Sequence, residues 1–282
     1  MKKYFTVPFL ALFVACGAGI AATEPATDKA FATALDAAIA GSWRSEAHKA
    51  RDVYRHPKET LTFFGLRSGM TVVEMSPGGG WYTEILAPLS RSSGVKLIGA
   101  VEDPESASDS DVKAEYVRDY KAYADKLAAD PARYSAVEVR KFSIVEPNFG
   151  KDGTVDAVLT FRNVHNYVML KNDRAMFQAF FKVLKPGGVL GVTDHRASVG
   201  ADVDKVKRLG YLPEAYVVKL ATDAGFVLEA RSEINANPKD TKDYARGVWT
   251  LPPTLDTAGE DKAKYLAIGE SDRMTLKFRK PK

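Results

Sequence analysis

The chain has 282 residues, with 40 lysines and arginines against 36 aspartates and glutamates and 45% hydrophobic residues, which is typical of a globular protein and excludes a disordered or fibrous one. The formal net charge of +4 is spread along the sequence and does not favour nucleic acid as a partner. Four histidines and one cysteine provide no zinc-type ligand spacing, so we expect no metal.

Residues 1–22 have the pattern of a secretory signal peptide, in which two lysines precede an apolar run and a stretch of small residues. The run is shorter than the roughly 20 residues of a membrane-spanning helix, so we expect no membrane span. Cleavage after Ala21 or Ala22 would release a periplasmic protein, whereas cleavage before Cys16 would leave a lipid anchor on that cysteine. In both cases we expect an exported protein.

Residues 23–60 are expected to form a helical lid, with helices at 28–40 and 44–55, and the second helix ends before Pro57 because proline restricts the preceding residue. Beyond it, apolar runs alternate with helical patterns. Strands are expected at 71–75, 96–101, 137–142, 156–162, 189–195 and 227–234, and helices at 81–90, 111–129, 173–184 and 213–224. The helix at 173–184 is stopped by a Lys-Pro-Gly-Gly segment, 185–188.

The alternation of strands and helices predicts an α/β fold, a doubly wound, Rossmann-like sheet that is mostly parallel. The expected strands are apolar on both faces, as strands covered on both sides are. Residues 273–280 alternate apolar and polar side chains, which predicts an antiparallel C-terminal edge strand and brings the sheet to seven strands. Residues 61–282 are expected to form one domain behind the N-terminal helical extension.

The most informative segment joins the strand at 71–75 to the next helix through Gly78, Gly79 and Gly80. Glycines at such a turn let backbone N–H groups approach a ligand and leave a helix N-terminus pointing at it. The third glycine of a dinucleotide fingerprint is missing, which disfavours a pyrophosphate ligand. Glu74, at the end of the strand, could instead face the amino group of a smaller ligand; a tight turn without a ligand is the alternative.

The segment Glu74-x-Ser76-x-Gly78-x-Gly80 resembles the first motif of the class I S-adenosylmethionine-dependent methyltransferases, with Ser76 in place of the first glycine. The resemblance extends through Glu102, through 156–162 and through the Leu-Lys-Pro-Gly-Gly segment, and covers roughly 61–280. More narrowly, Pro-Gly-Gly-Gly-Trp-Tyr-Thr and Phe-Arg-Asn-Val-His are similar to segments of exported bacterial proteins predicted to be methyltransferases. The resemblance implies S-adenosylmethionine as cofactor.

It also implies roles for individual residues. Glu102 follows Gly80 by 22 residues at the end of the second strand, where a carboxylate can accept hydrogen bonds from ribose hydroxyls. Asp103 is its competitor, because strand ends are uncertain by a few residues. Ser143 stands where the family contacts adenine, and Arg162 is grouped with the cofactor residues; ordinary loop roles are the alternatives.

Catalytic candidates follow the next two strands, at the carboxyl edge where open α/β sheets bind ligands. His165 is the candidate base that acts on the acceptor, with Asn163 or Asn166 to orient it, because neutral imidazole titrates near physiological pH. Asp194-His195-Arg196 forms a second polar cluster, with His195 the second candidate base. Packing and structural hydrogen bonding are the alternatives for both histidines.

The resulting hypothesis is methyl transfer from S-adenosylmethionine to a small-molecule acceptor in the cell envelope. The alternative is an exported protein that binds S-adenosylmethionine or a nucleoside without turnover, since the donor is made in the cytoplasm; a nicotinamide enzyme is a third. Two segments, 103–133 and 249–253, are expected to shape the acceptor pocket, because such folds carry substrate elements around a common sheet.

Overall fold

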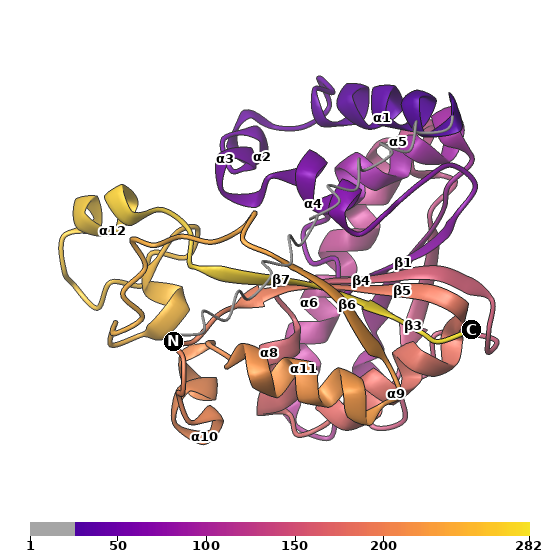
Figure 1. Cartoon of the computed structure of the whole chain (residues 1–282). Coiled ribbons are helices and arrows are strands. Elements are labelled where there is room, and N and C mark those ends of the chain that lie inside the picture. The colour runs from indigo at the N-terminus through magenta and orange to yellow at the C-terminus, as the bar shows by residue number, and fades with distance from the viewer. Residues whose placement is uncertain (1–25) are drawn as a thin grey trace, which may run out of the picture.

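The structure is a computed structural model that describes residues 26–282, so the expected signal peptide and Cys16 lie outside the described residues. A seven-stranded sheet in the order β3-β2-β1-β4-β5-β7-β6 runs through the molecule (Figure 1). The strands are β1 (Thr71–Met75), β2 (Lys96–Glu102), β3 (Glu138–Phe142), β4 (Val155–Phe161), β5 (Leu184–His195), β6 (Val227–Ser232) and β7 (Arg273–Arg279). The first five strands pair in parallel, and β7 is antiparallel to both β5 and β6.

Helices precede and connect the strands. They are α1 (Ala26–Ile39), α2 (Glu46–Lys49), α3 (Asp52–Arg55), α4 (Pro57–Phe63), α5 (Thr83–Ser93), α6 (Ser110–Ala129), α7 (Pro131–Tyr134), α8 (Val164–Met169), α9 (Asp173–Val183), α10 (Val203–Val206), α11 (Glu214–Asp223) and α12 (Lys262–Ile268). Short 3-10 turns lie at η1 (Pro104–Ser106), η2 (Lys207–Leu209) and η3 (Gly247–Thr250). None of these helices in 26–282 is long and apolar enough to cross a membrane.

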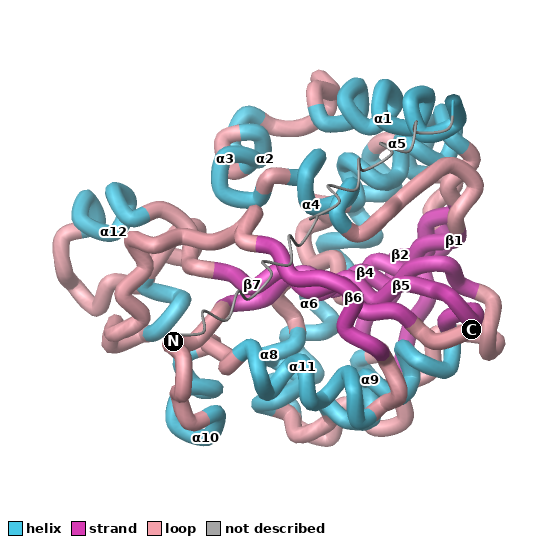
Figure 2. Tube along the Cα trace, viewed as in Figure 1, coloured by secondary structure: helices cyan, strands magenta, loops and turns pink. Residues whose placement is uncertain are grey.

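The sheet is covered on both faces, as the apolar strands predict (Figure 2). Alternate residues of β1 show the arrangement: Val72 belongs to the core under α1, α4 and α5, and Val73 to the core above α9 and α11. Both side chains are fully buried. Burial on both faces favours β-branched residues, which explains why β1 reads as a continuous apolar run.

The expected α/β class, the Rossmann-like doubly wound sheet and the antiparallel direction of the last strand are confirmed. The structure adds that β7 lies one strand in from the edge, with β6 outermost. Most side chains of β7 are buried, because β5 and β6 flank it and the cores cover its two faces. Strand β5 begins at Leu184, so the Lys-Pro-Gly-Gly segment lies within it, at an irregularity in the pairing with β4.

The single helix expected at 44–55 is wrong, because two short helices, α2 and α3, occupy this segment. Ser45 caps α2 by accepting a hydrogen bond from the His48 N–H at 3.1 Å. The buried Arg44 forms a bidentate ion pair with Asp52, at 2.7 Å for both contacts. This pair joins the segment before α2 to the first turn of α3 and fixes the fold of the chain between them.

The N-terminal helices lie against the core of the sheet (Figure 1). Phe31 and Leu35 of α1 are buried with residues of α5, and Trp43 donates a 2.8 Å hydrogen bond to the Glu84 carbonyl. His48 Nδ1 lies 2.8 Å from a carboxylate oxygen of Glu84. These contacts hold α2 and α3 beside the carboxyl edge of the sheet. The boundary at residue 60 between a lid and a second unit stays a prediction.

Candidate functional site

A cavity of about 630 Å³ opens at the carboxyl edge of the parallel strands. Its walls come from the turns after β1, β2, β4 and β5, from α6, and from the N-terminal helices. Open α/β sheets bind ligands at this edge, and ligand pockets have volumes of roughly 300–1,000 Å³. The expected residues Glu74, Ser76, Gly78, Glu102, Arg162, Asn163, His165 and His195 all line the cavity.

The turn after β1 forms the floor of the cavity. Gly78 has a φ of +54°, a left-handed conformation that favours glycine, and a Cβ added there would meet nothing within 4 Å. The open space beside Gly78 leaves room for a ligand to approach the backbone. Gly80 also has a positive φ, +73°, but it does not line the cavity and packs against the Lys126 side chain. Its expected cofactor contact is therefore corrected: Gly80 shapes the turn.

Glu74 is a carboxyl group buried at the end of β1, with 2% exposure. Burial raises its pKa to about 8, although the Thr83 hydroxyl donates a 2.7 Å hydrogen bond to it. The charge of Lys126 opposes the shift more weakly. A carboxyl group in this state is neutral near pH 7 and would ionise when a cation is placed beside it.

Ser76, in the position of the motif's first glycine, has a φ of +44° and joins the turn to β2. Its hydroxyl donates a short hydrogen bond to one carboxylate oxygen of Glu102, and its N–H donates to the Ala100 carbonyl at 2.8 Å. The serine therefore keeps the left-handed turn that glycine would allow, and it also orients the carboxylate. Burial raises the pKa of Glu102, which the Ser76 hydrogen bond opposes.

The competition between Glu102 and Asp103 is resolved by position. Strand β2 ends at Glu102, which lines the cavity, whereas Asp103 does not. The Asp103 side chain caps η1 by accepting a hydrogen bond from the Glu105 N–H at 3.3 Å. Ser143 likewise does not line the cavity: its hydroxyl accepts the Val145 and Glu146 N–H groups, both at 3.1 Å. Both side chains thus make local capping contacts, and their expected contacts with the cofactor stay predictions.

Apolar and aromatic side chains surround the Glu102 end of the cavity. Phe142 and Ile144, on either side of Ser143, line it together with Tyr116 and Tyr120 of α6. Asp109 caps α6 by accepting hydrogen bonds from two N–H groups of its first turn, at 2.9 and 3.0 Å. The segment 103–133 thus contributes to the cavity wall beside Glu102. That it shapes an acceptor pocket stays a prediction.

The two candidate histidines both contact one buried carboxylate. Asp194, fully buried at the end of β5, accepts a hydrogen bond from the His165 N–H at 3.1 Å and contacts His165 Nδ1 at 2.9 Å. It also accepts the N–H of His195 at 2.7 Å. The rings of His165 and His195 are 5.0 Å apart between centroids. Asp194 thereby orients His165 and leaves Nε2 as the ring nitrogen available to a ligand.

His195 differs from His165 in its surroundings. Burial lowers the pKa of His195 well below its usual value, and the neighbouring His165 and Arg162 lower it further. Its Nδ1 is hydrogen bonded to the Ser271 hydroxyl. A neutral imidazole held in this way is a hydrogen-bonding group rather than a cation at physiological pH.

Asn163 does not orient His165, which corrects the expected role. Its amide donates to the Met75 carbonyl at 2.9 Å and joins the ends of β1 and β4. Asn166 lines the cavity, and the contact that orients His165 comes from Asp194. His165 itself lies in the first turn of α8, a helix of six residues that follows β4.

His165, Asp194 and His195 also have the composition of a metal site, since one potential ligand atom from each lies within 4.8 Å of the others. Both oxygens of Asp194 already accept N–H hydrogen bonds. Arg55, Arg162 and Arg273 lie close enough to lower the pKa of His195, which disfavours a cation there. The chemistry of this cluster thus fits hydrogen bonding better than metal ligation, and the expectation of no metal stays a prediction.

An arginine cluster borders the histidines, and of its members the sequence analysis singled out only Arg162, as a cofactor residue. Arg51 and Arg55 of the α2–α3 region contact Glu270 through their Nε atoms at 2.6 and 3.3 Å, and Arg273 contacts it at 3.0 Å. Burial would raise the pKa of Glu270, but the charges of these arginines lower it to about 2. Arg162, with a φ of +64°, completes the cluster from the end of β4. Burial lowers its pKa to about 10.

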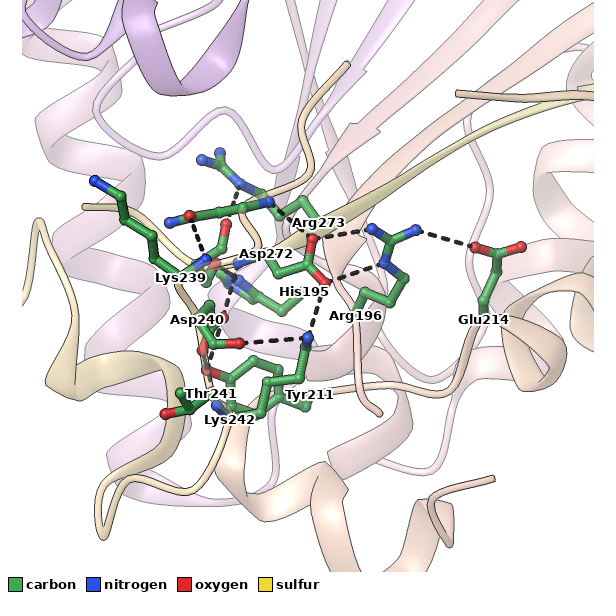
Figure 3. A network of polar contacts seen from close by, with 12 residues as sticks. His195, Arg196, Tyr211, Glu214, Lys239, Asp240, Thr241, Lys242, Asp272 and Arg273 are labelled. Carbon is green, nitrogen blue, oxygen red and sulfur yellow. Dashed lines mark hydrogen bonds and ion pairs between the residues drawn. The ribbon is translucent and has the colours of Figure 1, made fainter. Parts of the chain in front are cut away.

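The segment that carries Glu270 and Ser271 into the cavity is fixed from behind by a polar network around Asp272 (Figure 3). Arg196 donates two hydrogen bonds to Asp272, at 3.1 and 3.0 Å, and Lys242 lies 3.0 Å from it. The N–H of Asp272 donates to Asp240, which also accepts the Tyr211 hydroxyl at 2.9 Å. Arg196, part of the expected second polar cluster, therefore supports the cavity wall from outside.

The segment 249–253 closes another side, where Trp249, Pro252 and Pro253 line the cavity. The Trp249 ring lies 6.3 Å from the His165 ring between centroids. The segment therefore lies beside His165, and its expected role in shaping the acceptor pocket stays a prediction. Trp81 also lines the cavity and donates to the His48 carbonyl at 3.0 Å, which ties the glycine turn to α2.

No protein-family model matches the chain, and no curated protein matches it in sequence. Solved structures do match. The chain is similar to an S-adenosylmethionine-dependent methyltransferase from Aquifex aeolicus, at 18% identity over 82% of this chain and 93% of that one, with a TM-score of 0.51. It is also similar to the [4+2]-cyclase SpnF, at 16% identity over 89% and 93% of the two chains, with a TM-score of 0.53. A third is the pyocyanin biosynthetic protein PhzM, at 12% identity over 83% and 56%, with a TM-score of 0.52. The chain therefore shares the fold of these proteins, the mostly parallel seven-stranded sheet of an S-adenosylmethionine-dependent methyltransferase.

Proposed function

We propose that the chain is an S-adenosylmethionine-dependent methyltransferase that acts on a small-molecule acceptor. One observation carries the proposal: a single cavity brings together the open glycine turn, Glu74 and Glu102 on one side and the oriented His165 on the other. The likeness in fold to a methyltransferase supports it. Because the same fold occurs in a cyclase, the argument depends on the site rather than on the fold.

The residues present fit the cofactor. The open space at Gly78 is a backbone cradle that a side chain would fill. Glu102 has a carboxylate oriented by Ser76, suited to accept hydrogen bonds from ribose hydroxyls. Glu74 is neutral in the free protein because it is buried. It would ionise beside the positively charged amino group of S-adenosylmethionine and bind that group. Phe142 and Ile144 provide an apolar wall against which the adenine ring of the cofactor could pack.

When bound, S-adenosylmethionine supplies a methyl group on a positively charged sulfonium, ready for in-line transfer to a nucleophile. The main task of the chain is then to position the acceptor. In such reactions, correct positioning accounts for a large part of the lowering of the activation barrier. His165 would take the proton that the acceptor oxygen, nitrogen or sulfur loses, at Nε2, because Nδ1 is held by Asp194. Trp249 and the N-terminal helices would exclude water from the site.

The alternative is an exported protein that binds S-adenosylmethionine or a nucleoside without turnover. It is favoured by the expected export, since the donor is made in the cytoplasm.

We propose, with the sequence pattern of residues 1–22 as support, that the chain is exported to the periplasm and acts in the cell envelope. Mass spectrometry of the mature N-terminus tests this. A start near Ala22 would mean a soluble protein and an acylated Cys16 a lipoprotein, whereas an intact chain in the cytoplasm would contradict both.

Two measurements separate turnover from binding. Isothermal titration of the purified protein with S-adenosylhomocysteine tests for the nucleoside site. Incubation with methyl-labelled S-adenosylmethionine and a panel of small acceptors then tests for transfer of label. Binding with transfer supports the methyltransferase, binding without transfer to any acceptor supports the alternative, and the absence of binding to demonstrably folded protein contradicts both.

A further inference from the structure

The arginine cluster beside the histidines has an uncompensated positive charge. Arg51, Arg55 and Arg162 line the cavity, and Arg273 lies behind them. The carboxylates that face the four guanidinium groups are those of Glu270 and, further away, Asp194. Among these six groups, positive charge therefore exceeds negative charge by two.

Two polar atoms of the cluster lack partners. Arg162 Nε and Arg51 Nη2 are buried and make no hydrogen bond to any residue in 26–282. Arg55 is 7% exposed, and its guanidinium lies 4.6 Å above the Trp81 ring. A guanidinium N–H that is buried without an acceptor is costly, and a bound anion would offset this cost. Arg162 lines the cavity and its Nε has no partner among residues 26–282, so this part of the cavity fits an anionic ligand.

We propose that the arginine cluster binds an anionic group, a carboxylate or a phosphate, of the acceptor molecule. This inference rests on the proposed function, because it assigns the glycine turn and Glu102 to the donor and the remaining space to the acceptor. Planar guanidinium groups match carboxylate and phosphate oxygens bidentately, which is why arginine predominates in such sites.

The donor alone does not satisfy the cluster. S-adenosylmethionine carries a sulfonium and an ammonium group against one carboxylate, so its binding adds positive charge to the cavity. Its carboxylate could pair with one guanidinium at most in a bidentate way. Arg273 of the cluster pairs with His195 across β5 and β7, and the His195 ring lies 5.0 Å from the ring of the candidate base, His165, between centroids. An anionic acceptor anchored there would lie near His165.

The test uses inorganic phosphate and acetate as probes, titrated into the purified protein at constant ionic strength with chloride as the balancing anion. Tryptophan fluorescence is the readout, because Trp81 and Trp249 both line the cavity. Each titration is run with and without saturating S-adenosylhomocysteine. The phosphate and acetate arms show which kind of anion the site takes.

Arg162→Gln and Arg51→Gln are the test variants, and the second keeps the test valid if the first fails to fold. Arg91→Gln, at an exposed position near the end of α5, is the matched control. We expect saturable binding of at least one probe in the presence of S-adenosylhomocysteine. Each test variant should weaken it by about 10- to 100-fold, the loss typical of charged hydrogen bonds, and the control should not.

The possible failures are distinguishable. The proposal is wrong if neither phosphate nor acetate binds. It is also wrong if Arg162→Gln and Arg51→Gln bind these probes as tightly as the wild type does. If S-adenosylhomocysteine abolishes probe binding and Arg162→Gln weakens S-adenosylhomocysteine itself, the donor carboxylate occupies the cluster and the assignment to the acceptor is overturned. If S-adenosylhomocysteine does not bind but the probes do, the anion site stands and the proposed function fails.

Discussion

The carboxylate of Asp194 holds both the ring and the backbone of His165, through contacts of 2.9 Å to Nδ1 and 3.1 Å to the N–H. His165 follows β4 and Asp194 lies near the end of the adjacent parallel strand β5, so the sheet itself brings them together. An imidazole that donates from Nδ1 to a carboxylate has Nε2 free to accept a proton. This pair is the structural basis for placing the base of the proposed reaction at His165.

Replacing His165 with alanine should lower methyl transfer by about 10²–10⁴-fold, the range of general acid–base groups. The affinity for S-adenosylhomocysteine should stay nearly unchanged if His165 acts on the acceptor alone, because Glu102 ends β2 and His165 follows β4, with β1 between these two strands. Turnover assays and calorimetry on the same preparation check both. A collapse of donor affinity would instead make His165 part of the cofactor site, and no effect on either would leave transfer to positioning alone.

Asp194→Asn should lower turnover by a similar factor, but through His165, so Asp194 is a positioning residue. An amide in place of the carboxylate no longer accepts equally from the ring nitrogen and the two N–H groups, and it favours the other tautomer. The pH dependence of turnover is the informative readout. In the variant, we expect a shift along the pH axis of the part of the rate profile that reports the catalytic base. Partial loss of folded protein alone would lower the rate at every pH without such a shift.

Glu74 should make the free protein less stable as the pH rises. Its pKa is about 8 in the folded state and 4.5 when exposed, so the folded chain holds a proton that the unfolded chain has lost. Stability from this group is fully present below pH 4.5 and falls between pH 4.5 and 8. The slope is at most about 1.4 kcal/mol per pH unit. Glu74→Gln should remove this fall and Glu59→Gln, an exposed control, should keep it, as measured by urea unfolding from pH 5 to 8. If the free energy of unfolding had the same pH dependence in the wild type and in Glu74→Gln, Glu74 would not be the group that causes the fall.

Glu270 should have the opposite dependence on pH. Its pKa is lowered from 4.5 to about 2, so its contribution to stability is present above pH 4.5 and is lost as the pH falls toward 2. Glu270→Gln at pH 7 leaves the arginines without their nearest counter-charge and should destabilise the fold by about 3–5 kcal/mol. Glu146→Gln, at an exposed glutamate, is the control for urea unfolding. An equal, small effect of both variants would mean that solvent screens the cluster.

Much of the fold follows from the sequence because the sheet is buried on both faces. Strands such as β1 read as unbroken apolar runs, and β1 has the predicted bounds of 71–75. The segment at 44–55 was misjudged because a tertiary ion pair, Arg44 with Asp52, overrides a helical pattern. Local propensity does not contain that information.

The candidate site divides in the same way. Glu74, Gly78 and Glu102 could be placed because they lie on a strand-turn-helix-strand pattern that the sequence predicts. Gly80 packs against the Lys126 side chain and does not line the cavity, which spacing alone does not reveal. The contacts of Arg51 and Arg55 with Glu270 span 219 and 215 residues, and no local signal joins such distant positions. The sequence identifies Asp194-His195-Arg196 as a polar cluster. It does not show that Asp194 contacts His165, that His195 contacts Ser271, or that Arg196 contacts Asp272.

The central claim is that the cavity binds the nucleoside of S-adenosylmethionine through Glu102. Calorimetric titration of S-adenosylhomocysteine into the wild type, Glu102→Ala and Asp103→Ala tests it most directly, because Asp103 is the adjacent carboxylate and does not line the cavity. We predict one-site binding to the wild type, unchanged in Asp103→Ala and weakened by about 1–3 kcal/mol in Glu102→Ala, the cost of losing a charged hydrogen-bond partner. No binding to folded wild-type protein, or equal affinity of all three proteins, would contradict the claim.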